Sequence, residues 1–80
     1  MAQIPLFIFD IIDSLVASRY MNARSVVYYE DIKKQIEDSG YNFQSEWMNF
    51  EKDYTNKGWS VYYNEQEQFY IFRKLTLKFN

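Results

Sequence analysis

The hydrophobic pattern of this 80-residue chain changes its period near Gly58, from helical spacing to alternation. Before Gly58, apolar residues recur at the i, i+3 and i+4 positions of amphipathic helices, for example at Ile8, Ile12 and Leu15. After Gly58, apolar and aromatic residues fall on every second position, as they do along a strand with two different faces. The sequence therefore predicts an α+β fold.

Local signals divide the chain into five segments. Pro5 suits a first helical turn, whereas Gly40 and Gly58 suit helix ends. A β-branched and aromatic run after Arg24 is typical of a short strand. Eighty residues leave no room for a second core, so we expect one domain over 1–80. Its expected elements are a helix over 5–20, a strand over 25–29, helices over 30–39 and 43–57, and a hairpin over 59–79.

This order resembles that of winged helix-turn-helix proteins over residues 5–74, with residues 59–73 as the wing. The resemblance implies a winged-helix-like fold, read as helix, short strand, helix, helix, strand, strand. An alternative gives almost the same pattern: the helices over 30–39 and 43–57 merge and pack on a three-stranded antiparallel sheet.

Aromatic residues are unusually frequent, with 8 Tyr, 7 Phe and 2 Trp. A chain this short buries only roughly 60% of the surface that its unfolded form exposes, so part of these rings should lie outside. Exposed aromatic patches usually mark interaction sites. We expect a protein-binding patch on the even-numbered face of the hairpin, formed by Tyr62, Tyr70 and Phe72, and Tyr28 of the strand over 25–29 is a further candidate. Alternatively, a helix covers this face, or both faces are covered.

The chain has no Cys and no His. Their absence excludes Ser-His-Asp and Cys-His catalysis and the usual zinc sites, and the isolated Gly40 and Gly58 cannot form a phosphate-binding loop. The sequence therefore predicts a protein that is not an enzyme and needs no cofactor or metal. Because disulfides are excluded and the N-terminal region has no signal-peptide pattern, we also expect a cytoplasmic protein without a membrane segment.

The net charge of −2 is not the strongly basic balance of a dedicated nucleic-acid-binding domain. A winged-helix protein would nevertheless contact DNA through the helix over 43–57 and through the wing. The candidate contacts are Gln44, Asn49, Lys52, Asn56, Arg73 and Lys74. Acidic residues on the same surfaces, including Glu46, Asp53 and Glu65, oppose this interpretation because phosphates are negative.

The segment Lys57-Gly58-Trp59-Ser60-Val61-Tyr62-Tyr63, followed by Phe69-Tyr70-Ile71-Phe72, is similar to the C-terminal strands of small tailed-phage accessory proteins. This resemblance covers about 20 residues and implies an intracellular viral protein that acts on a host machine; it transfers no functional residue.

Two function classes are consistent with these features. The first is a small non-enzymatic protein-binding module, a phage accessory protein that binds and modulates or inhibits a host protein complex. The alternative is a winged-helix DNA-binding transcriptional regulator. A homodimer is a further alternative, because the last strand extends through Leu77 and Phe79 and an unpaired strand edge favours self-association.

Overall fold

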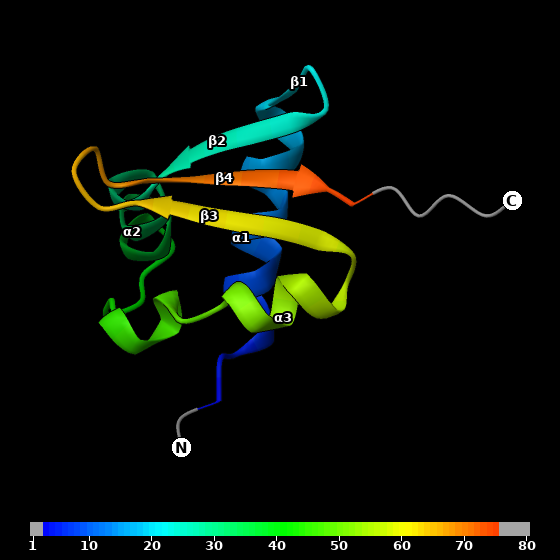
Figure 1. Cartoon of the computed structure of the whole chain (residues 1–80). Helices are drawn as coiled ribbons and strands as arrows, with labels where there is room; N and C mark the ends of the chain where they lie inside the picture. Colours follow the sequence, from blue (N-terminus) through cyan, green and yellow to red (C-terminus); the bar gives the residue numbers. More distant parts are fainter. Residues whose placement is uncertain (1–2, 76–80) are drawn as a thin grey trace, which may run out of the picture.

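The computed structural model describes residues 3–75, which contain helices and antiparallel strands, so the predicted α+β class is confirmed (Figure 1). In chain order the elements are α1 (Leu6–Ser18), β1 (Tyr20–Met21), β2 (Arg24–Tyr28), α2 (Tyr29–Asp38), a 3₁₀ helix (Ser45–Met48), α3 (Glu51–Asn56), β3 (Trp59–Asn64) and β4 (Phe69–Lys74).

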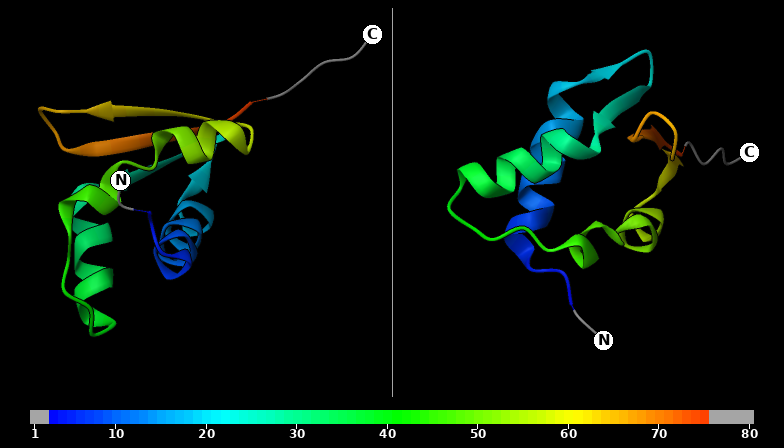
Figure 2. Two further views of the ribbon diagram at one scale, coloured as in Figure 1. Left: turned by 90° about the horizontal axis from the view of Figure 1, so that it is seen from below. Right: turned by 90° about the vertical axis from the view of Figure 1, so that its left-hand side faces the viewer.

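The four strands form one antiparallel sheet in the order β1-β2-β4-β3. Figure 2 (left) shows α1 and α2 on one side of the sheet, below the strands. α3 packs on the same face, because its Tyr54 ring meets Phe72 of β4. The sheet therefore has a core face, which packs on the helices, and an open face, which no helix of residues 3–75 covers. Side chains alternate between these two faces along every strand.

The helical spacing of α1 and α2 produces their buried stripes. Ile8, Ile12, Leu15 and Val16 are buried on α1, and they follow the spacing that puts side chains on one side of a helix. On α2, the buried residues Ile32 and Ile36 are four positions apart and therefore lie on one side of the helix. Both helices contact β2, so their buried side chains pack against the sheet and form the core with it.

The predicted first helix over 5–20 is too long, because α1 ends at Ser18 and Tyr20 already belongs to β1. The chain then reverses at Asn22 and Ala23, whose φ angles are 55° and 66°, and Tyr20 pairs with Ser25. Two consecutive positive φ angles are the geometry of a tight type I′ hairpin turn. This turn adds a fourth strand to the three that the sequence predicted.

The predicted helix over 43–57 is interrupted. Its residues form the 3₁₀ helix, a break at Asn49 and Phe50, and the short α3. The reason lies in Met48, which a continuous helix would place about 100° around the axis from Trp47. With the break, Trp47, Met48 and Phe50 are all buried. The merged helix of the alternative fold does not form, because α2 ends at Asp38 and the next helical turn begins at Ser45.

Other boundaries differ by a single residue: the predicted strand over 25–29 is observed at Arg24–Tyr28, and the predicted helix over 30–39 at Tyr29–Asp38. Shifts of this size are within the ordinary uncertainty of element ends. The predicted hairpin over 59–79 begins as expected, but its part beyond Leu75, including Leu77 and Phe79, lies outside the described residues.

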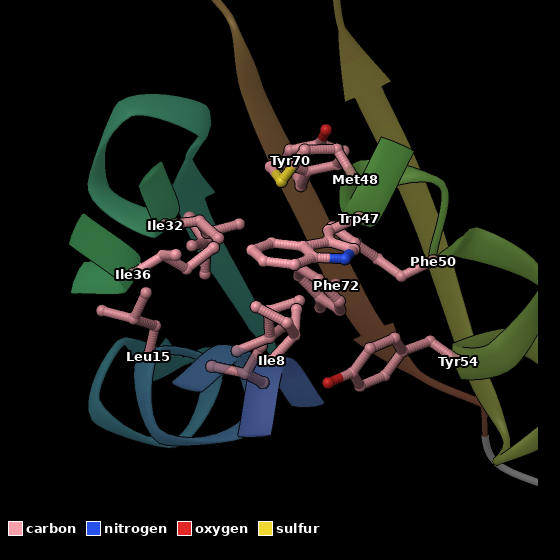
Figure 3. Close-up of a cluster of buried hydrophobic side chains, with 13 residues drawn as sticks. Ile8, Leu15, Ile32, Ile36, Trp47, Met48, Phe50, Tyr54, Tyr70 and Phe72 are labelled. Carbon is pink, nitrogen blue, oxygen red and sulfur yellow. The ribbon is translucent and has the colours of Figure 1, made fainter. Parts of the chain in front are cut away.

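Aromatic rings form the part of the core next to the sheet. The Phe50 ring stacks on Phe72, with centroids 5.9 Å apart, and Tyr54 meets Phe72 edge-on at 5.3 Å. Tyr70 lies 4.9 Å from Phe50. Figure 3 shows these rings converging with Trp47 and the aliphatic side chains of α1 and α2. Much of the aromatic surplus therefore stabilises the interior, since aromatic pairs add about 0.5–1.5 kcal/mol beyond their burial.

Candidate functional site: the open face of the sheet

The hairpin register decides which aromatic residues are exposed. A four-residue loop joins the paired residues Asn64 and Phe69, so even-numbered positions of β3 face the same side as odd-numbered positions of β4. Tyr62 pairs with Ile71, not with Tyr70 or Phe72. The expectation that the even-numbered positions share a face is therefore wrong.

Two of the predicted patch residues belong to the core. Tyr70 is 5% exposed and Phe72 is 0% exposed, because both point from β4 toward the helices. The other two are surface residues on the open face: Tyr62 is 59% exposed and Tyr28 is 47% exposed. The structure thus retains Tyr62 and Tyr28 as candidates and removes Tyr70 and Phe72 from any surface site.

On the open face, cross-strand partners align apolar side chains in two rows. Val26 of β2, Ile71 of β4 and Tyr62 of β3 form the central row. Tyr28 and Phe69 form the next row, and their rings meet edge-on with centroids 5.5 Å apart. We call these five residues the aromatic patch. Contiguous apolar surface on an uncovered sheet face is typical of an interaction site.

Two arginines border the aromatic patch at one end. Arg24 and Arg73 are cross-strand partners, both are exposed, and both point to the open face. Like charges directly opposite one another destabilise a sheet. Within residues 3–75 neither guanidinium lies in an ion pair, since the ion pair found there joins Arg19 to Asp31. This end of the patch therefore favours an anionic group from outside, and a guanidinium can bind a carboxylate through two hydrogen bonds.

The titratable groups with the clearest changes lie on the core side. Burial is the main cause that raises the pKa of Tyr54 above its ordinary value, and the Asp13 carboxylate, which accepts a 2.6 Å hydrogen bond from the Tyr54 hydroxyl, adds to it. Burial likewise raises the pKa of Tyr70. Both hydroxyls thus stay protonated at neutral pH, and their burial indicates a structural role.

The described part of the chain offers little for metal or membrane binding. Among residues 3–75, no three His, Cys, Asp or Glu side chains gather in a way that would hold a metal ion. No helix in that range has the length and apolar character needed to cross a bilayer.

The six candidate nucleic-acid contacts do not form one surface. Asn49, Lys52 and Asn56 line a shared hollow beside α3, but Glu46 and Asp53 line it too. Gln44 is exposed before the 3₁₀ helix and does not line this hollow. Arg73 and Lys74, as neighbours on β4, point to opposite faces of the sheet.

Sequence reasoning missed four residues of the open face. Val26, Phe69, Ile71 and Arg24 complete the surface around Tyr62 and Tyr28. The length of the β3–β4 loop could have found Phe69 and Ile71, because an even number of loop residues reverses the parity between the two strands. Val26 and Arg24 depend on the pairing of β2 with β4, for which the sequence has no local signal.

Comparisons with known proteins found no matching family model, no matching curated protein and no matching solved structure.

Proposed function

We propose that this chain is a small non-enzymatic protein-binding module, and that the aromatic patch on the open face is its docking surface. The observation that carries the proposal is the row of Val26, Ile71 and Tyr62 on a sheet face without a covering helix among residues 3–75. Tyrosine is favoured at such surfaces because it supplies a large contact area at low conformational-entropy cost.

The chemistry of the partner surface can be inferred from the patch and its border. Apolar side chains would pack on Tyr62, Tyr28 and Phe69. Carboxylates at one end would meet Arg24 and Arg73 and relieve the repulsion between them. The similarity of the tail to tailed-phage accessory proteins supports a host protein complex as this partner, which the module would modulate or inhibit in the host cytoplasm.

A capture experiment with matched variants tests the proposal. The tagged protein is incubated with a bacterial lysate, with and without nuclease, beside the variants Tyr62→Ser and Tyr41→Ser. Tyr41 is a suitable control because it is a tyrosine of similar exposure, 46%, that stacks on Phe7 of α1 and lies away from the open face. We expect the tagged protein to capture a partner protein even after nuclease treatment. The Tyr41→Ser variant should still capture this partner, and the Tyr62→Ser variant should not.

A charge reversal at Arg24 gives a second test of the docking surface. Arg24→Glu turns the like-charged cross-strand pair into an opposite-charged pair, which should leave folding intact and weaken capture of the same protein. Capture that is independent of both Tyr62 and Arg24 would contradict the docking surface. Capture that requires intact nucleic acid would favour the alternative, a winged-helix DNA-binding regulator, which further predicts weaker binding at high salt and after replacement of Lys52, Arg73 and Lys74 by Ala.

A further inference from the structure

A second surface lies on the other side of the sheet, in a groove of about 640 Å³ at the end of the core face. The groove is lined by Val16 and Ala17 of α1 and by Trp59 of β3. Tyr20 of β1 joins them, with its ring 6.3 Å from Trp59 and nearly perpendicular to it. The groove thus has apolar and aromatic walls from α1, β1 and β3.

Two lysines stand at its rim. The Lys57 Nζ lies 4.8 Å from the centroid of Phe9 and 5.2 Å from that of Tyr54, and the Lys74 Nζ lies 5.0 Å from the centroid of Trp59. These cation–π contacts hold both ammonium groups beside the opening. We call this site the lysine groove.

Neither ammonium group is neutralised by a carboxylate of residues 3–75, because the ion pair found there joins Arg19 to Asp31. One carboxylate, that of Asp13, also lines the groove and keeps its negative charge while it accepts the hydrogen bond of the Tyr54 hydroxyl. The lysine groove therefore combines apolar walls with two positive charges, which lie in no ion pair among the described residues, and with one negative charge.

The backbone fixes the positions of these groups. Trp59 and Lys74 are cross-strand partners, and the Leu75 N–H donates a 2.7 Å hydrogen bond to the Gly58 carbonyl, which continues the β3–β4 ladder past them. Lys57 immediately precedes this ladder, at the end of α3. A site formed on such a framework needs little reordering when it binds, which lowers the entropic cost of association.

We propose that the lysine groove binds an acidic segment of a partner protein, with one aromatic or aliphatic side chain packed against Trp59, Tyr20 and Val16. Carboxylates that flank this side chain would pair with Lys57 and Lys74. Charge complementarity argues for this occupant, since an apolar segment without acids would leave both ammonium groups unpaired at the edge of the contact. The proposal is independent of the open face, which lies on the opposite side of the sheet.

The two tryptophans of the chain allow peptide binding to be followed by NMR. Trp59 lines the groove, whereas Trp47 is a core residue, so their indole N–H signals report separately on the groove and on the fold. The ¹⁵N-labelled protein is titrated with the capped peptide Asp-Glu-Leu-Phe-Asp-Glu. We expect saturable shifts of the Trp59 indole, no shift of Trp47, and no binding of a matched peptide with Lys in place of the acids or with Ala in place of Leu and Phe.

The variant Lys57→Gln/Lys74→Gln should weaken peptide binding by roughly threefold to tenfold, because two charge pairs are removed at exposed positions. Lys33→Gln is the matched control, since Lys33 also stands over an aromatic ring, that of Phe43 at 5.7 Å, but outside the groove. Tyr62→Ser should leave peptide binding unchanged, so this result separates the lysine groove from the open face. Thermal unfolding curves verify that each variant folds.

Other results would overturn the proposal. Equal affinity for the acidic and the Lys-containing peptide would show that the two ammonium groups do not select the ligand. Equal loss of affinity in Lys33→Gln would show a general charge effect. Inorganic phosphate or a thymidine oligonucleotide that displaces the peptide at equal concentration would identify a general anion site instead of a peptide groove.

Discussion

Tyr62 of β3 and Ile71 of β4 are cross-strand partners on the open face of the sheet, whereas their sequence neighbours Tyr63 and Tyr70 pair on the core face. Tyr62 is 59% exposed, whereas Tyr70, the cross-strand partner of its neighbour Tyr63, is 5% exposed. This register separates the aromatic residues of the hairpin into those that stabilise the fold and those that are available for binding.

Phe72 and Tyr62, one from each face of the sheet, should differ sharply in their contribution to stability. Phe72→Ala should reduce the free energy of unfolding by about 3–5 kcal/mol, because it opens a cavity among the rings of Phe50, Tyr54 and Trp59. Tyr62→Ser should reduce it by less than about 1 kcal/mol, as is usual for an exposed position. Urea unfolding measures both values, and similar losses in the two variants would contradict the register.

Ala23 offers a stabilising substitution. Its φ of 66° lies in the left-handed region, which costs an L-residue with a Cβ roughly 1–2 kcal/mol but costs glycine nothing. Ala23→Gly should therefore raise the free energy of unfolding by about 1 kcal/mol, despite the greater flexibility of glycine in the unfolded chain. Ala17→Gly is the control: at this exposed position of α1 the same change should lower stability by about 1 kcal/mol. A loss in both variants would refute the turn geometry.

The hydrogen bond from Tyr54 to Asp13 should contribute measurably to stability. It joins α3 to α1, and hydrogen bonds to charged groups contribute about 1.5–3 kcal/mol. Because the carboxylate is partly exposed, we expect a coupling energy near the lower value in a double-mutant cycle of Tyr54→Phe and Asp13→Ala. Additive effects of the two substitutions would show that the bond contributes nothing.

Alkaline pH should destabilise the protein through two buried tyrosines, Tyr54 and Tyr70. Since Tyr54 and Tyr70 have pKa values raised above the ordinary value of 10.0, the folded state keeps protons that the unfolded state loses. Their contribution to stability is therefore complete below about pH 10 and declines as the pH rises further, by about 1.4 kcal/mol per pH unit for each group. Urea unfolding at a series of pH values on both sides of about pH 10 measures this decline. In Tyr54→Phe the free energy of unfolding should decline less steeply with pH. An unchanged slope would contradict the contribution of Tyr54.

Periodicity was enough to predict the class of fold and most of its elements. The stripes of α1 and α2 and the alternation of β3 and β4 follow directly from the residues. The strand β1 was missed because two residues carry no period, and because Ala23 is not a typical residue for its turn. The break at Asn49 was missed because Trp47, Phe50 and Tyr54 keep helical spacing across it.

The candidate site was only partly accessible from the sequence. The surplus of aromatic residues predicted exposed rings, but it named the buried Tyr70 and Phe72 together with Tyr62 and Tyr28. Which rings share the open face depends on how the strands pair. The lysine groove joins residues from α1 and from the region around β3, and such distant contacts leave no local pattern in the chain.

The placement of the helices on one side of the sheet has a consequence for which positions can vary. Substitutions at Tyr62, Tyr28 and Phe69 change the open face, so these positions can vary without a matching change in the core. The two faces of one sheet are thus under different physical constraints: the core face must fit the helices, whereas the open face need not.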